Sequence, residues 1–346
     1  MERIKIKNIY YMLSYAFRVL TEDKYKNIEA EEFDYTADLM AAILAKGISG
    51  QIKRGLGKDY VVRTEELSSP KGKIAISDSV KNHSMASGRL YCSYDLYEEN
   101  NYMNKVLKST AMKLIGCEDV KTEHKKELKK ILLFFNDVDE IPLQSVRWNE
   151  FSFTRNNATY KMLMNICKYV VKGLLPSDED GNDKLHRYLD DRQLHDLYEK
   201  FILEYYKKHY PEFNAAANMI DWNVDDGYKT LLPAMKTDVT IEYYGKTTII
   251  DAKFYSRMLQ YNSMFQSSTI HSNNIYQIFS YVKNKDKKGD GSVNGILLYA
   301  KTTDEQTLDQ TYQMGGNIIS VKTLDLNQDF SKIKETLDKI AVMAKT

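Results

Sequence analysis

Two aspartates and a lysine in the second half of the chain, Asp238, Asp251 and Lys253, are the residues best placed to do chemistry. Two β-rich runs flank Tyr244-Gly245, which predicts a tight hairpin turn because glycine adopts a positive φ without strain. A turn centred between these residues places Asp238 directly opposite Asp251, with Cβ atoms roughly 4.5–5.5 Å apart. Lys253 points to the same face, since strand side chains alternate. A three- or five-residue loop would turn the partner side chain to the other face.

Paired carboxylates of this kind favour the binding of a divalent metal ion. Two like charges that face each other repel, so a structural role requires a compensating cation. Mg²⁺ prefers hard oxygen ligands, usually one or two carboxylates together with waters and a phosphate. It would polarise a phosphodiester and lower the pKa of a bound water, while Lys253 could orient that water or stabilise charge in the transition state. The alternative is a surface hairpin with ordinary acidic and basic positions.

Three further polar residues lie on the helices expected before and after this hairpin. Glu199 is placed beside the apolar stripe of the preceding helix. Gln277 and Tyr281 stand four residues apart, so they share one face of the following helix, at the edge of its apolar stripe. Each residue alone fits an ordinary position at the rim of a core. Together the residues follow a fixed order: an acid on a helix, an acid on a strand, Asp-x-Lys on the next strand and Gln-x₃-Tyr on a helix. This combined order is less easily obtained by chance than any one of its parts.

Hydrophobic periodicity predicts the elements that must position these residues. The second half indicates an α-β-β-α-β-β-α order around a mixed sheet, with helices near 191–209, 274–283 and 331–343 and strands near 296–300 and 317–321. The first half mixes helices with short strands. Its expected helices cover about 9–20, 36–54, 101–115, 123–135 and 158–173, and its expected strands 59–66, 73–77 and 89–95.

A turn-rich acidic segment, residues 176–183, predicts a domain boundary. We therefore expect an N-terminal mixed α/β region over 1–176 and a second domain over 184–346. The fold class is α/β (α+β), and 346 residues suffice for two domains with cores of their own.

Composition limits the class of protein. The 49 Lys and Arg nearly balance the 48 Asp and Glu, so a strongly basic nucleic-acid binder is not indicated. The 3 cysteines are too few for a disulfide framework and fit a reducing cytoplasm. No stretch approaches the apolar length of a membrane span, and no signal peptide is recognised at the start. We expect a soluble cytoplasmic chain with no membrane partner.

The order of acids, lysine and Gln-x₃-Tyr resembles the PD-(D/E)xK nuclease core in its RecB-like variant. More specifically, the chain resembles the McrC family, the nuclease subunit of McrBC-type 5-methylcytosine restriction systems. The resemblance covers nearly the whole sequence and is carried by residues 6–16, 60–67, 71–74, 194–201, 232–238 and 250–253. It implies a restriction-endonuclease-like second domain with a mixed sheet flanked by helices.

The resemblance also implies a set of metal ligands. Asp238 and Asp251 would bind Mg²⁺, or alternatively Mn²⁺, with the backbone carbonyl of Ala252 as a third ligand and Glu199 assisting. One departure from the family pattern is Thr237, where proline often precedes the first acid; this substitution is common among such nucleases.

Catalytic and supporting roles follow for the remaining site residues. Lys253 would be the catalytic lysine, and Gln277 and Tyr281 would support the site or contact the DNA backbone. Asn8 and Tyr11 are more consistent with roles in the fold or in a partner surface than with chemistry.

The resemblance implies an endodeoxyribonuclease that acts in a complex. Its expected partners are double-stranded DNA and a McrB-like AAA+ GTPase hexamer, whose GTP hydrolysis the N-terminal region stimulates. The chain has no P-loop pattern of its own, which agrees with GTP being bound by the partner. A balanced charge predicts weak and salt-sensitive DNA binding by the isolated chain.

Three alternatives remain open from sequence. The chain could belong to a multi-subunit type II system of the BsuMI type that cuts unmethylated sites. It could be a non-catalytic activator of the partner GTPase, or a nuclease that acts alone.

Overall fold

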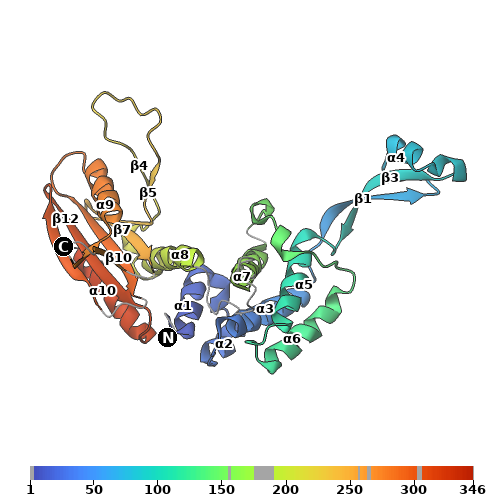
Figure 1. Ribbon diagram of the computed structural model, residues 1–346, viewed down its shortest axis with the longest axis horizontal. Helices are drawn as coiled ribbons and strands as arrows, with labels where there is room; N and C mark the ends of the chain where they lie inside the picture. Colours follow the sequence, from blue (N-terminus) through green and yellow to red (C-terminus); the bar gives the residue numbers. More distant parts are fainter. Residues whose placement is uncertain are drawn as a thin grey trace. The chain divides into compact units, whose positions relative to one another are not determined.

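The computed structural model describes residues 4–154, 157–174, 191–255, 258–262, 266–301 and 306–345 (Figure 1). The chain forms two compact units, one of residues 1–33 with 189–346 and the other of residues 34–188. The fold mixes helices and strands, as expected. The predicted boundary segment, 176–183, lies outside the described residues.

The first unit differs from the expected division because it takes residues 1–33 away from the N-terminal region. Helix α1 (Ile6–Ala16) is held by residues near the C-terminus. The Asn8 amide donates to the carbonyls of Leu326 and Gln328, both at 2.8 Å, and Tyr11 stacks on Phe330. Asn8 and Tyr11 are therefore residues of the fold, as the sequence indicated.

A five-stranded mixed sheet forms the centre of the first unit, in the order β11-β12-β10-β7-β6. Strand β10 pairs in parallel with β7 and β12, and the two edge strands pair antiparallel. The predicted mixed sheet is thus confirmed. The strands are β6 (Val239–Tyr243), β7 (Lys246–Phe254), β10 (Val293–Lys301), β11 (Asp309–Met314) and β12 (Asn317–Asp325).

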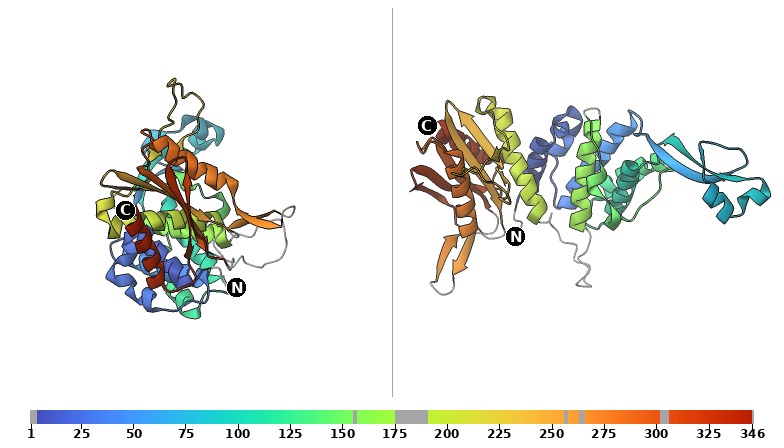
Figure 2. Two further views of the ribbon diagram at one scale, coloured as in Figure 1. Left: turned by 90° about the vertical axis from the view of Figure 1, so that its left-hand side faces the viewer. Right: turned by 90° about the horizontal axis from the view of Figure 1, so that it is seen from above.

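Helices cover both faces of this sheet (Figure 2). Helix α9 (Ser272–Lys285) packs on one face so closely that a Cβ on Gly295 would come within 2.8 Å of Ile278. Helices α8 (Asp191–His209) and α10 (Phe330–Lys345) cover the other face, joined by a bond from the Tyr206 hydroxyl to the Leu337 carbonyl. The core strands are apolar and β-branched because both of their faces are buried.

Two short antiparallel ribbons and an edge strand were not expected from the sequence. The ribbons are β4 (Met219–Ile220) with β5 (Met235–Lys236), and β8 (Leu259–Asn262) with β9 (Ser267–Ile270). The edge strand is β11, whose polar residues are largely exposed. Strands β4 and β5 have two residues each, too few to show a hydrophobic period, and β9 and β11 are polar and largely exposed, so periodicity does not reveal them.

The second unit combines a helical core with a three-stranded sheet in the order β1-β3-β2. Helix α3 (Thr36–Ile52) is the most buried of its helices, and the lysine-rich α6 (Thr122–Leu132) buries one stripe and exposes lysines on the other side. The remaining elements are α4 (Ile76–Lys81), α5 (Tyr102–Ile115), α7 (Ala158–Leu174), β1 (Asp59–Leu67), β2 (Lys73–Ile74) and β3 (Leu90–Glu98).

Short helical segments complete the described chain. The first unit also contains helix α2 (Lys26–Ala30). The 3₁₀ turns are Arg18–Thr21, Asp23–Tyr25, Ser84–Ser87, Leu133–Phe135, Leu143–Ser145, Trp148–Glu150 and Pro211–Phe213. Within the described ranges, no helix combines the length and apolar character needed to cross a membrane. The three cysteines are buried and free.

Candidate active site

The β6–β7 hairpin has the register that the sequence predicted. Tyr244 and Gly245 both take positive φ, 43° and 82°, which is the backbone of a two-residue turn of type I′. The ladder runs from Tyr243 opposite Lys246 to Val239 opposite Ile250. Asp238 is the next residue and lies at the end of the ladder, so its backbone continues toward Asp251.

Asp238 is anchored to the neighbouring strand by its side chain. Its Oδ2 accepts a hydrogen bond of 2.8 Å from the backbone amide of Ala252. The residue before it, Thr237, exchanges backbone and side-chain hydrogen bonds with Asn218. The carboxylate therefore reaches across to the C-terminal part of β7 from a well-supported backbone.

Asp251 and Lys253 form a buried ion pair on β7. Their exposed fractions are 1% and 7%, and Lys253 Nζ lies 2.8 Å from Asp251 Oδ2. The ammonium compensates the charge of this buried carboxylate, so neither group is buried as an isolated ion.

Helix α9 contributes a short hydrogen-bonded chain that ends on the lysine. Lys253 Nζ donates to Gln277 Oε1 at 3.0 Å, and Gln277 Nε2 donates to the Tyr281 hydroxyl at 2.9 Å. These are the glutamine and tyrosine that the sequence placed on one helical face. The chain holds the ammonium between Asp251 and the helix, which restricts its rotamers.

Glu199 enters from helix α8 together with a residue that the sequence analysis did not select. His195 Nδ1 lies 2.8 Å from Glu199 Oε1, one helical turn away. The His195 side chain is partly buried, with an exposed fraction of 27%. The i, i+4 spacing of His195 and Glu199 was the available signal.

Burial and neighbouring charges shift the pKa values of the two aspartates and the lysine. Burial, followed by Asp251 and Glu199, raises the pKa of Asp238 to about 7. Burial also raises the pKa of Asp251, although Lys253 opposes this rise. Burial disfavours the charged form of Lys253, but Asp251 and Asp238 outweigh it and raise its pKa. Three acids and one lysine therefore share a region of excess negative charge.

This arrangement fits a hard divalent cation. The candidate donors are carboxylate oxygens, which Mg²⁺ and Mn²⁺ prefer. Burial, followed by Asp251 and Glu199, disfavours the charged form of Asp238, and a bound cation would favour that charged form. The structure thus brings together all six side chains selected from the sequence, and it adds His195.

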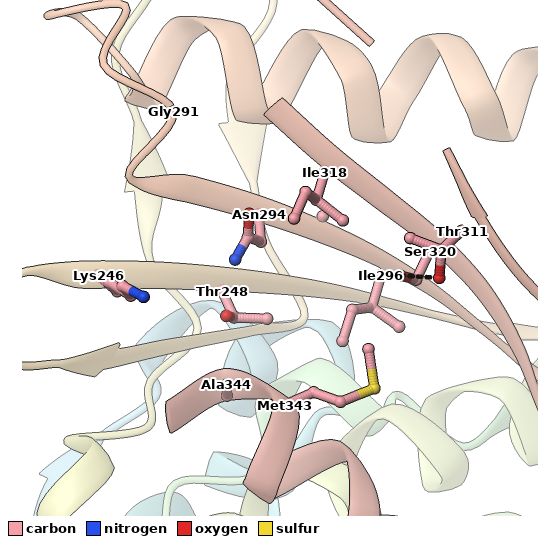
Figure 3. Close-up of a pocket in the computed structure, with 11 residues that line it drawn as sticks. Lys246, Thr248, Gly291, Asn294, Ile296, Thr311, Ile318, Ser320, Met343 and Ala344 are labelled. Atoms are coloured by element: carbon pink, nitrogen blue, oxygen red, sulfur yellow. Dashed lines mark hydrogen bonds between the residues drawn. The ribbon is translucent and has the colours of Figure 1, made fainter. Parts of the chain in front are cut away.

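A separate cavity of about 250 Å³ lies on the other face of the sheet (Figure 3). It is bounded by side chains of β7, β10 and β12 and by Met343 at the end of α10. Strand alternation turns Thr248, which lines it, away from the face that carries Asp251. The cavity is therefore distinct from the acidic cluster.

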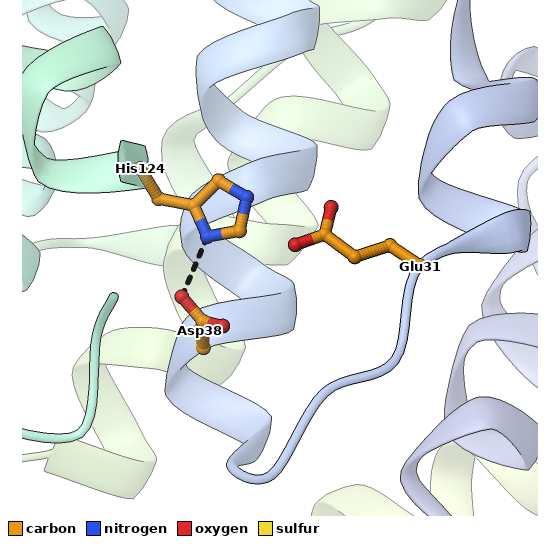
Figure 4. Close-up of side chains that lie close together, drawn as sticks. All are labelled: Glu31, Asp38 and His124. Carbon is orange, nitrogen blue, oxygen red and sulfur yellow. Dashed lines mark hydrogen bonds and ion pairs between the residues drawn. The ribbon is translucent and has the colours of Figure 1, made fainter. Parts of the chain in front are cut away.

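The second unit contains another buried carboxylate, Asp38 on α3 (Figure 4). Its Oδ1 contacts His124 Nδ1 at 2.6 Å and accepts the backbone amide of Lys121 at 2.9 Å. The Lys121 ammonium lies 3.8 Å from Oδ2. These contacts tie α3 to the start of α6.

Comparisons with known proteins agree with this architecture. A curated relative from Escherichia coli (strain K12), the type IV methyl-directed restriction enzyme EcoKMcrBC, is 26% identical over 338 residues, which cover 96% of both chains. Among solved structures, the chain is similar to one from a half-complex of Thermococcus gammatolerans McrB AAA+ hexamers with bound McrC. The TM-score is 0.52 at 14% identity, with 98% of this chain and 76% of that chain covered.

The family assignment rests on a match that spans most of the sequence. Residues 2–300 match the family described as McrBC 5-methylcytosine restriction system component. The solved structure supports the fold alone, while the family match and the full-length relative reach both units. The chain therefore belongs to the McrBC 5-methylcytosine restriction system component family.

Proposed function

We propose that this chain is the Mg²⁺-dependent endonuclease subunit of a GTP-dependent McrBC-like restriction system. It cleaves phosphodiester bonds of foreign double-stranded DNA when it is assembled with an AAA+ GTPase partner. The observation that carries the proposal is the cluster of three acids, Asp238, Asp251 and Glu199, beside the buried Lys253.

The residues divide into cation ligands and a group that acts on the substrate. Asp238, Asp251 and Glu199 would hold the metal, with the carbonyl of Ala252 as a further ligand. When bound, Mg²⁺ or Mn²⁺ would polarise the phosphodiester and lower the pKa of a bound water. Lys253 stays protonated beside Asp251 and can stabilise negative charge on the phosphate.

Gln277 and Tyr281 keep the lysine in place. Lys253 has a long side chain that loses up to about 2 kcal/mol of rotamer entropy when it is ordered. The hydrogen bond to Gln277 restricts the ammonium before substrate arrives, and Tyr281 in turn orients the amide. Preorganised charge of this kind contributes to rate because it does not have to be rearranged during the reaction.

The partner and the target are proposed by comparison. The similar solved structure is described as McrC bound to McrB AAA+ hexamers, and the full-length relative is described as methyl-directed. We propose that a McrB-like hexamer binds the GTP and that this chain stimulates its hydrolysis. Methylated DNA is the first substrate to test.

The experiment combines the purified chain, its AAA+ partner, GTP, Mg²⁺ and plasmid DNA with and without cytosine methylation. We expect double-strand cleavage that requires GTP and is lost in Asp251→Ala and Lys253→Ala. A matched control is Asp325→Ala, which removes an Asp–Lys pair between β12 and β10, 3.7 Å from Lys301 Nζ. Control cleavage should equal that of the unaltered chain.

Each alternative has its own outcome. Undiminished cleavage by Asp251→Ala would reject the site and favour a non-catalytic activator. Cleavage without any nucleotide would indicate a nuclease that acts alone. Cleavage restricted to unmethylated plasmid would indicate a type II system.

A further inference from the structure

Helix α8 carries His195, which contacts one acid of the cluster formed by Asp238, Asp251 and Glu199. His195 and Glu199 are four residues apart, so their side chains meet on one helical face, with Nδ1 and Oε1 2.8 Å apart. An ionised carboxylate can only accept hydrogen bonds, so Nδ1 carries the proton and donates it. This contact uses one of the two oxygens of Glu199.

Glu199 needs such support more than the two aspartates do. Asp238 is held by the Ala252 amide, and Asp251 is buried beside Lys253. Glu199 is on a helix, has a longer side chain and remains 31% exposed. Repulsion from the aspartates would favour rotamers in which its carboxylate turns toward solvent.

The histidine also lies within electrostatic reach of the strand residues. Its hydrogen bond to Glu199 raises the pKa of His195, and both Asp238 and Lys253 act on it. In return, His195 counteracts the rise in the pKa of Asp251. His195 thus belongs to the same cluster as the strand acids.

We propose that His195 is a positioning residue of the nuclease site. Its Nδ1–H fixes the Glu199 carboxylate, and the second carboxylate oxygen is thereby kept available to the cation. The inference rests on the proposed function because it assumes that Glu199 assists in metal binding. Groups that orient metal ligands typically contribute 10–100-fold to affinity.

Three substitutions distinguish hydrogen bonding from simple occupancy. His195→Leu keeps much of the volume but removes the donor. His195→Asn places an amide N–H near the position of Nδ1, and His195→Gln places it near that of Nε2. We expect His195→Leu and His195→Gln to weaken affinity for Mn²⁺ about 10-fold, and His195→Asn to restore most of it.

The readouts are Mn²⁺ affinity by isothermal titration calorimetry with the full chain, and the Mg²⁺ concentration for half-maximal cleavage with the partner present. The Mg²⁺ requirement should rise about 10-fold in His195→Leu, with a smaller change in cleavage rate at saturating Mg²⁺. Lys339→Leu is the control, since it removes a similar i, i+4 pair with Glu335 on α10, at 2.9 Å. Its metal affinity should not change.

A double-mutant cycle makes the test independent of folding effects. In a Glu199→Ala background, His195→Leu should cause a much smaller loss of Mn²⁺ affinity than in the unaltered chain, because its main route to the metal has been removed. The inference is overturned if His195→Leu binds Mn²⁺ like the unaltered chain, if His195→Asn is as weak as His195→Leu, or if the losses add in the double variant. Failure of the proposed function is different: the unaltered chain itself would show neither Mn²⁺ binding nor metal-dependent cleavage.

Discussion

Asp38 in the second unit and Asp251 in the first are both 1% exposed, yet their neighbours differ. His124 Nδ1 and the Lys121 backbone amide contact Asp38 Oδ1, and the Lys121 ammonium lies 3.8 Å from Oδ2. Asp251 has one cationic neighbour on its own strand and also faces further acids. Hydrogen bonds from another helix hold Asp38 in the fold, whereas Asp251 lies among other carboxylates whose mutual repulsion a cation would relieve. On the proposed function, this difference distinguishes a structural acid from a metal ligand.

The largest expected effect is the loss of cleavage in Asp251→Asn. Removal of the central carboxylate should reduce the cleavage rate about 10³-fold or more, since a metal contributes several kcal/mol to charge stabilisation. The free energy of unfolding should also fall, because Asp251→Asn leaves the buried Lys253 ammonium without its ion-pair partner. Activity assays at a temperature at which the variant stays folded, and chemical denaturation without metal, measure the two effects. Undiminished cleavage by the folded variant would contradict the role of Asp251 in the site.

The second prediction concerns pH. In the unfolded chain Asp238 releases its proton near pH 4, and in the folded chain near pH 7. Between these values the folded state binds more protons, so stability falls as pH rises from about 4 to about 7 and then levels off, by a few kcal/mol at most. Melting temperatures in metal-free buffer should show this decline.

Two controls isolate the contribution of Asp238. Asp238→Asn should flatten the decline, and saturating Mg²⁺ should reduce it in the unaltered chain. A melting temperature that rises over the same pH range in all samples would contradict the assignment.

A smaller effect is expected from His124→Ala. Loss of one donor leaves Asp38 partly unsatisfied in a buried position, which should cost about 1–3 kcal/mol of the free energy of unfolding. Cleavage per folded molecule should stay unchanged at a temperature below the transition. A specific loss of cleavage in a stable His124→Ala protein would show that this pair is more than structural.

The smallest effect should come from Gln277→Leu, which removes the acceptor of Lys253 but keeps the ion pair with Asp251. A hydrogen bond to a charged group contributes about 1.5 kcal/mol, so cleavage should slow about tenfold. Single-turnover cleavage at saturating metal measures this change. If Gln277→Leu lost as much activity as Asp251→Asn, the glutamine would act on substrate directly.

Much of the fold and of the candidate site followed from local patterns. The turn at Tyr244-Gly245 specified the register of β6 and β7, and that register determined where Asp238 meets β7. The i, i+4 spacing of Gln277 and Tyr281 placed both on one face of α9. These features depend on residues close in sequence, so the chain determines them without knowledge of the rest of the fold.

Other features depend on packing between segments that are far apart in the sequence, and hydrophobic periodicity does not predict them. The attachment of α1 to the C-terminal residues depends on bonds between positions more than 300 residues apart. The partial burial of His195 and Glu199 depends on how α8 packs in the first unit.

By itself, the sequence determined the mixed α/β class, the hairpin register and the set of acids and lysine, because turn chemistry and periodicity act over a few residues. Only the tertiary structure decided that Asp251 is buried beside Lys253, that Gln277 reaches Lys253 and that Glu199 is paired with His195. The physical reason is that burial and charge coupling are properties of the surroundings, which distant segments supply when they pack together.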